Sequence, residues 1–152
     1  MTIEKVWQQL KQITTLELTT ICRKIPPSFE KRVGKAKVII QSQGDEEITF
    51  FEKGTWEGVQ SRNRTAFTNV YCWQIDREKG VLSLSSLRLG VERPLLLFTL
   101  TPLEAHFYKS LGPHECNEDT YAATLQHDDH FIALDWHVTG PKKNEAIRLV
   151  YS

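Results

Sequence analysis

The sequence has no excess charge of either sign and no hydrophobic stretch long enough to cross a membrane. Its longest largely apolar segment is Pro94–Leu100, whereas a membrane-spanning helix needs roughly 20 apolar residues. Basic and acidic residues balance at 19 each, so no net field attracts the chain to a phosphate backbone or an anionic lipid surface. We therefore expect no membrane and no nucleic acid among its partners.

Cysteine is also scarce, and the motifs of common enzyme chemistries are missing. Cys22, Cys72 and Cys116 stand at wide spacings, and residues 1–5 lack the apolar segment of a secretory signal. These features predict a cytoplasmic protein with reduced thiols. The sequence contains no Gly-x-Ser-x-Gly elbow, phosphate-binding loop or dinucleotide fingerprint, and we predict no cofactor. A length of 152 residues, 40% hydrophobic and 25% charged, indicates one soluble domain over residues 1–152.

The pattern of apolar residues predicts one helix followed by many short strands. Apolar side chains recur at three- and four-residue steps over Ile3–Ile13, the spacing of an amphipathic helix. The expected strands, rich in β-branched and aromatic residues, are Leu16–Arg23, Arg32–Ser42, Glu46–Phe51, Ala66–Ile75, Val81–Leu89, Leu95–Thr101, Thr120–Gln126, Phe131–Val138 and Glu145–Tyr151. Most links are short and polar, with longer loops at 54–65 and 102–119. We expect an all-β, antiparallel up-and-down barrel of about eight to nine strands with one N-terminal helix.

The densest group of reactive side chains lies in residues 112–121. His114, Cys116, Asp119 and Tyr121 offer an imidazole, a thiol, a carboxylate and a phenol. Their spacing matches no zinc motif, and the run His127–His130 is interpreted as a solvated hairpin tip, so no metal site is predicted. A structural role for the group, with a capping carboxylate and a buried thiol, remains an alternative.

Strand pairing predicts that this group lies at the same rim as the turn Gly140–Lys143. A tight hairpin at Asp128-Asp129 would place Tyr121 directly opposite Trp136 and bring Asp119 toward that turn. We expect at least one hydrogen bond or ion pair between residues 114–119 and the turn at residues 140–143. The candidate ligand-binding residues are His114, Cys116, Asp119, Tyr121, Trp136, Lys142, Lys143, Tyr71 and Trp73.

Tyr71 and Trp73 are candidates because they alternate along one face of a strand. Aromatic residues at every second position line a ligand cavity in some barrels and fill the core in others, and the sequence does not decide between these. By the same alternation Trp136 points inward, with Ile132, Leu134 and Val138. Asp135 and His137 then point outward and are interpreted as a surface pair.

Several segments together resemble an uncharacterised family of small calycin-like β-barrel proteins. The resemblance covers about residues 31–151, and its specific part is a His-x-Cys-x-x-Asp-x-Tyr motif at 114–121 with a Gly-Pro-x-Lys turn at 140–143. It implies a barrel that binds a small molecule, with a site that contains His114, Cys116, Asp119, Tyr121, Trp136, Gly140, Pro141 and Lys143.

Three functions are compatible with this sequence. The first is binding of a small apolar or amphipathic anionic molecule in a barrel cavity, with lysines at its mouth. The second is an enzyme, a hydrolase or isomerase, in which His114, Cys116, Asp119 and Lys143 carry the chemistry. The third is a structural or protein-interaction module, in which the same cluster only locks the fold.

Overall fold

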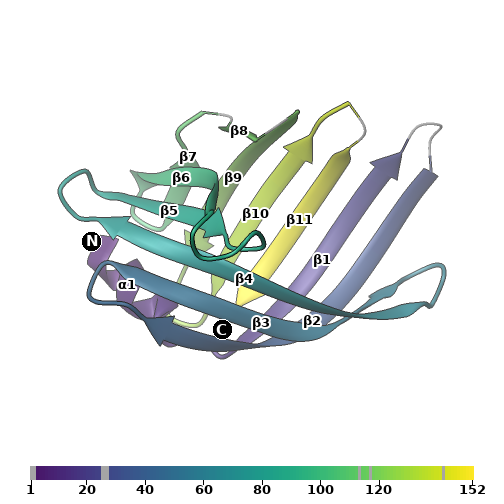
Figure 1. The fold of residues 1–152 in the computed structure, drawn as a ribbon, viewed down its shortest axis with the longest axis horizontal. Coiled ribbons are helices and arrows are strands. Elements are labelled where there is room, and N and C mark those ends of the chain that lie inside the picture. Colours follow the sequence, from purple (N-terminus) through teal and green to yellow (C-terminus); the bar gives the residue numbers. More distant parts are fainter. Residues whose placement is uncertain (1–2, 25–27, 113, 117, 142) are drawn as a thin grey trace.

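The computed structural model describes residues 3–24, 28–112, 114–116, 118–141 and 143–152. Within these residues the chain forms one helix, α1 (Ile3–Leu10), and eleven strands (Figure 1). The strands are β1 (Thr15–Lys24), β2 (Ser28–Ser42), β3 (Glu47–Gly58), β4 (Arg64–Asp76), β5 (Val81–Ser86), β6 (Leu95–Glu104), β7 (Phe107–Ser110), β8 (His114–Cys116), β9 (Asp119–His127), β10 (Ile132–Thr139) and β11 (Asn144–Tyr151).

Ten of the described strands close into an antiparallel barrel. Neighbours follow the order β10-β11-β1-β2-β3-β4-β5-β6-β7-β9, and pairing of β9 with β10 closes the ring. This up-and-down barrel with one N-terminal helix confirms the predicted fold class. The short strand β8 pairs with β9 on the edge opposite to β10, which is the edge that β7 also pairs with.

The prediction of two long loops is wrong, because both segments contain strand residues. Residues 102–119 include β7 and β8, which are too short to give a recognisable pattern. At residues 54–65, β3 continues to Gly58 and β4 begins at Arg64. Gly54 is the first residue of the expected loop, but it is a close-packing position within β3, since an added Cβ would clash with the carbonyl oxygen of Lys35.

Side chains alternate between the barrel interior and its outer surface. The inward face of β10 is buried as predicted, with Ile132, Leu134, Trp136 and Val138 all in the core. On its outward face Asp135 forms an ion pair with Arg148 on β11, at 2.6 Å. These observations confirm the inside and outside of this strand as the sequence predicted them.

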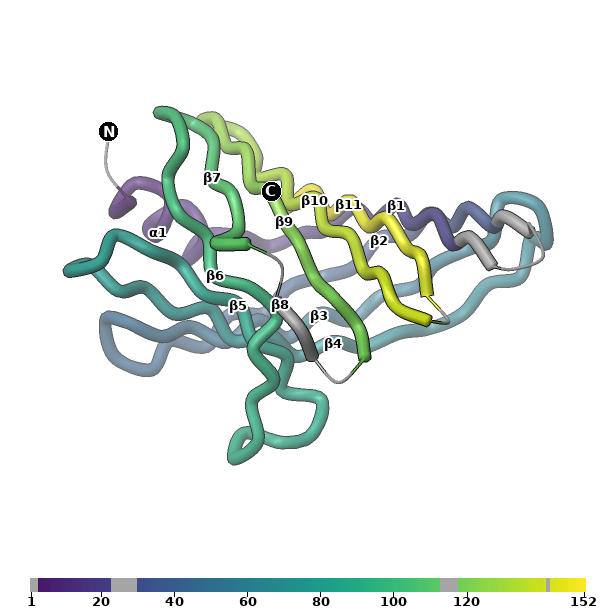
Figure 2. Tube along the Cα trace, turned by 90° about the horizontal axis from the view of Figure 1, so that it is seen from above, coloured from purple at the N-terminus to yellow at the C-terminus, as the bar shows by residue number. Residues whose placement is uncertain are grey.

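Helix α1 closes one end of the barrel. Figure 2 shows it at one end, while the β1–β2 and β3–β4 hairpins extend toward the other. Val6, Trp7 and Leu10 are fully buried, and the Trp7 indole Nε1 donates a hydrogen bond to the carbonyl oxygen of Asp45 at 3.1 Å. The helix ends at Leu10, three residues before the expected end. No helix in the described residues is long and apolar enough to span a membrane.

Candidate functional site

The β9–β10 hairpin determines which side chains meet at the open end of the barrel. Its link is longer than the sequence suggested, because the Asp128 carboxylate accepts hydrogen bonds from the backbone N–H groups of His130 and Phe131, at 2.7 and 3.0 Å. Tyr121 therefore lies opposite Val138, and the predicted direct pairing of Tyr121 with Trp136 is wrong. The shift is an even number of residues, so the same side chains still point inward.

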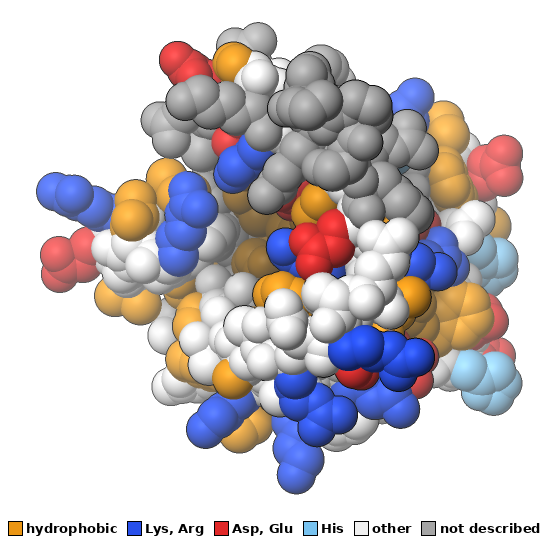
Figure 3. Space-filling view, turned by 90° about the vertical axis from the view of Figure 1, so that its right-hand side faces the viewer, with side chains coloured by type: hydrophobic (Ala, Val, Ile, Leu, Met, Phe, Trp, Pro, Cys, Tyr) orange, Lys and Arg blue, Asp and Glu red, His pale blue; other side chains and the backbone are white. Residues whose placement is uncertain are grey.

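A cavity of about 460 Å³ lies inside the barrel at the end opposite to α1. Its lining residues are Thr68, Asn69, Val70, Tyr71, Ser86, Leu87, Arg88, Leu95, Leu97, Tyr121, Trp136, Val138, Lys143, Glu145 and Ile147. Figure 3 shows the face on the right of Figure 1, where hydrophobic side chains lie in a recess with acidic and basic side chains around it. The cavity exceeds the roughly 300 Å³ that small-molecule sites require.

Aromatic rings form one wall of this cavity and pack edge to face. The Trp136 ring lies 6.1 Å from the ring of Tyr71, 5.6 Å from that of Phe98 and 6.3 Å from that of Tyr121. Edge-to-face pairs of this kind hold their rings in defined orientations. The rings therefore hold one another in place along this wall.

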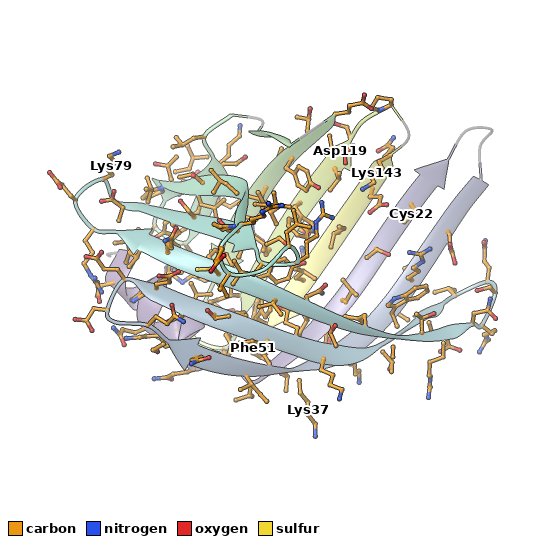
Figure 4. The ribbon with its side chains drawn as sticks, in the orientation of Figure 1. Cys22, Lys37, Phe51, Lys79, Asp119 and Lys143 are labelled. Carbon is orange, nitrogen blue, oxygen red and sulfur yellow. The ribbon has the colours of Figure 1, made fainter. Side chains whose placement is uncertain are left out.

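The predicted contact at the rim is confirmed. The Asp119 carboxylate at the start of β9 lies 3.4 Å from the Lys143 amine in the β10–β11 turn, and Figure 4 shows these two side chains together at the open end. Gly140 allows the approach, because an added Cβ there would clash with the Asp119 carboxylate. The start of β9 and this turn therefore meet at the rim.

Replacing Asp119 by Ala is expected to cost about 1 kcal/mol of unfolding free energy or less. The Asp119 and Lys143 side chains are 22% and 47% exposed, and solvent screens such a pair. Urea denaturation of the wild type and Asp119→Ala measures the loss, with Asp119→Asn as the matched control. A loss of several kcal/mol would contradict this expectation and would favour the cluster as a structural lock.

Four further candidate residues, His114, Cys116, Lys142 and Trp73, are not among the described residues that line the cavity. His114 pairs with Tyr121 and Cys116 with Asp119 through the backbone, because the chain folds back as β8 instead of continuing toward the 140–143 turn. The side chains of His114 and Cys116, and Lys142 as a whole, lie outside the described residues. Trp73 is fully buried against Phe50 and does not line the cavity.

Two polar residues of this region were missed by the sequence interpretation. Arg88 lines the cavity from the β5–β6 connection. Glu52 is 2% exposed and points into the barrel from β3, behind Asn69. One of its carboxylate oxygens accepts a hydrogen bond from the Tyr151 hydroxyl at 2.6 Å, and the other from the Asn69 amide at 3.4 Å. An acidic residue at an inward strand position is the signal that could have revealed it.

Burial raises the pKa of Glu52 to about 7, although the hydrogen bonds from Tyr151 and Asn69 lower it. Burial likewise raises the pKa of Tyr71, and the nearby Glu52 carboxylate raises it further. Tyr71 therefore remains a neutral phenol at physiological pH. Of these two neighbouring groups, Glu52 is the one whose pKa lies near neutral pH.

The described lining offers several polar and charged side chains. It contains arginine, lysine, glutamate, asparagine and tyrosine side chains, but no histidine or cysteine among the described residues. No group of three or more metal-ligating side chains occurs in the described part of the chain. The His127–His130 segment differs from its interpretation as a solvated tip, because His127 is 3% exposed and packs against His106 and Tyr108.

Comparison with known proteins places the chain in a family and confirms its fold. The model of a family of unknown function, DUF6314, matches residues 19–152. No curated protein matches the chain. The solved structure of the S-type phycobiliprotein lyase CPES from Guillardia theta superposes with a TM-score of 0.63 at 10% sequence identity, over 99% of this chain and 92% of that chain. At this identity the likeness shows the barrel with its N-terminal helix, and nothing about chemistry.

Proposed function

This chain belongs to the DUF6314 family of unknown function, and we propose that it binds a small amphipathic molecule with an anionic group in the cavity at the open end of its barrel. The observation that carries the proposal is the cavity itself, about 460 Å³ in volume, which combines an aromatic and aliphatic wall with Arg88 and Lys143. Pockets of this size with few polar groups bind small molecules through apolar contact and fix their orientation through the polar groups.

Two basic residues, Arg88 and Lys143, against one acidic residue, Glu145, line the cavity, which favours an anionic group on the ligand. Arg88 forms no ion pair with any residue that the structure describes, so its guanidinium is available to a carboxylate, sulfonate or phosphate. Lys143 forms a partly exposed ion pair with Asp119. The anionic group of a ligand can replace Asp119 in this pair at little cost in free energy. The apolar body of the ligand then lies against the aromatic wall around Trp136.

Arg88→Ala is expected to weaken binding of the amphipathic anion 8-anilinonaphthalene-1-sulfonate about tenfold, because a charge-assisted contact is lost. Lys143→Ala is expected to have a smaller effect, since Lys143 already pairs with Asp119. Fluorescence titration of the full chain measures both affinities, and competition by laurate checks that the probe reports the cavity. Phe98→Ala, behind the aromatic wall, tests whether the wall contributes.

Lys79→Ala is the matched control, because Lys79 lies on the β4–β5 turn far from Asp119 and Lys143 (Figure 4). It should leave the affinity unchanged. The proposal fails if the wild type gives no saturable fluorescence increase, or if Arg88→Ala and Lys79→Ala bind the probe equally.

A further inference from the structure

The connection between β5 and β6, residues 87–94, projects from the barrel beside the cavity (Figure 2). We refer to it as the β5–β6 loop. Its first residues, Leu87 and Arg88, line the cavity. The rest of the loop extends away from the barrel, which makes it a prominent feature of the open end.

Backbone hydrogen bonds give the β5–β6 loop a defined shape. The N–H of Gly90 donates to the carbonyl of Leu87 at 2.9 Å, and the N–H of Arg93 donates to the carbonyl of Gly90 at 3.1 Å. These are two consecutive turns, joined at Gly90, whose φ of 103° favours glycine. A further bond from the N–H of Leu87 to the carbonyl of Val70 fastens the loop to β4.

This ordered loop holds apolar side chains out in solvent. Leu89 is 56% exposed, Val91 is 76% exposed, and Leu96 at the base of the loop is 38% exposed. They are three of the nine large hydrophobic side chains that are exposed among the described residues, gathered within eight positions. A concentration of this kind on a protruding element indicates an interaction site.

Basic side chains stand on both sides of the apolar tip. Arg88 precedes Leu89, and Arg93 follows Val91 with Glu92 between them. Neither arginine forms an ion pair with a residue of the described chain. The loop therefore presents an apolar tip with unpaired positive charge at its base.

We propose that the β5–β6 loop docks the open end of the barrel on an anionic lipid surface. Leu89 and Val91 enter the boundary between headgroups and acyl chains, while Arg93 lies at the level of the anionic headgroups. A small convex tip fits between lipid headgroups without a matching concave surface, whereas a stable protein interface needs about 800 Å² on each partner. The net charge of zero gave no indication of this surface, because the loop carries only one more arginine than acidic residues.

The docking proposal depends on the β5–β6 loop and not on the proposed ligand. It adds a lipid surface as a partner of the protein. A barrel docked through this loop would hold its cavity near the lipid surface, because Leu87 and Arg88 belong both to the loop and to the cavity lining. Amphipathic molecules concentrate in lipid surfaces. The ligand would then enter the cavity without crossing water.

The test is binding of the full chain to vesicles of phosphatidylcholine with about 30% phosphatidylserine. We expect the double variant Leu89→Ser/Val91→Ser to lower the vesicle partition coefficient at least about tenfold, because both inserting side chains are lost. Arg93→Ala should reduce the preference for phosphatidylserine vesicles over phosphatidylcholine vesicles, and added salt should weaken binding of the wild type. Cosedimentation measures all of these quantities.

The matched control is Leu103→Ser/Leu111→Ser, which removes two leucines that are 61% and 62% exposed elsewhere on the barrel. It should bind vesicles like the wild type. The inference is overturned if the wild type does not bind anionic vesicles, if the control loses as much binding, or if Leu89→Ser/Val91→Ser only dissolves a dimer in analytical ultracentrifugation. Binding of 8-anilinonaphthalene-1-sulfonate should stay intact in the loop variant, so failure here and failure of the ligand proposal are distinguishable.

Discussion

Replacing Glu52 by Gln is expected to raise the free energy of unfolding by about 3 kcal/mol at about pH 8, and to change it little at about pH 4. The Glu52 carboxyl is 2% exposed, and no cation among the described residues compensates its charge. Burial therefore opposes ionisation and raises its pKa from 4.5 to about 7. Glutamine has nearly the same shape and an oxygen that accepts the hydrogen bond from Tyr151, but it carries no charge.

The direction of the pH dependence follows from the raised pKa. Protonated Glu52 is favoured in the folded state, so its full contribution to stability is present below about pH 4.5, the ordinary pKa of the unfolded chain. Stability is lost as the pH rises from there through about 7, and the loss is complete above that value. Denaturant unfolding of the wild type and Glu52→Gln across this range should give curves that diverge with rising pH.

Glu17→Gln is the control, since Glu17 is an exposed carboxylate on β1, and its change should stay within about 0.5 kcal/mol. If Glu52→Gln instead destabilises the protein above neutral pH, the expectation is wrong, because the negative charge of Glu52 would then be stabilised by its surroundings. Asn69, whose amide is hydrogen-bonded to Glu52, lines the cavity, so the Glu52 carboxyl lies directly behind the cavity wall.

The fold could be predicted because its signals are local and repeated. Alternation of apolar and polar residues identified the strands, and short polar links identified hairpins, which together specify an up-and-down barrel. The same alternation placed Trp136 inside and Asp135 outside. The inward positions of Tyr71 and Tyr121 follow from it too, and both line the cavity with Trp136 and Lys143.

The sequence-based predictions were wrong mainly where one residue type occurs in two kinds of structure. The expected loop began at Gly54, yet this glycine allows β2 and β3 to pack closely within the sheet. Because the expected strand ended at Phe51, Glu52 lay beyond its end. Phe131 has strand character, yet the Asp128 carboxylate draws it into the turn and shifts the register. Arg88 falls within the expected strand Val81–Leu89, but β5 ends at Ser86, and Arg88 reaches the cavity from the loop that follows.

Replacing Trp7 by Ala is expected to lower the free energy of unfolding by about 4 kcal/mol, and the melting temperature by roughly 10 °C. Trp7 is fully buried between α1 and the closed end of the barrel, and its indole N–H is bonded to the carbonyl of Asp45. Alanine removes the ring and leaves a cavity that the surrounding β-barrel, held by its closed hydrogen-bond network, cannot collapse to fill. Thermal unfolding followed by circular dichroism measures the loss.

Trp7→Phe separates the two contributions, because it keeps an aromatic ring and removes only the hydrogen bond and part of the volume. It should cost about 1–2 kcal/mol. Well below the melting temperature, both variants should bind 8-anilinonaphthalene-1-sulfonate like the wild type, since no described residue of α1 lines the cavity at the other end. Lost binding in a variant that circular dichroism shows to be folded would mean that the helix and the open end are coupled. A loss below about 1 kcal/mol for Trp7→Ala would mean that α1 is not part of the folded core.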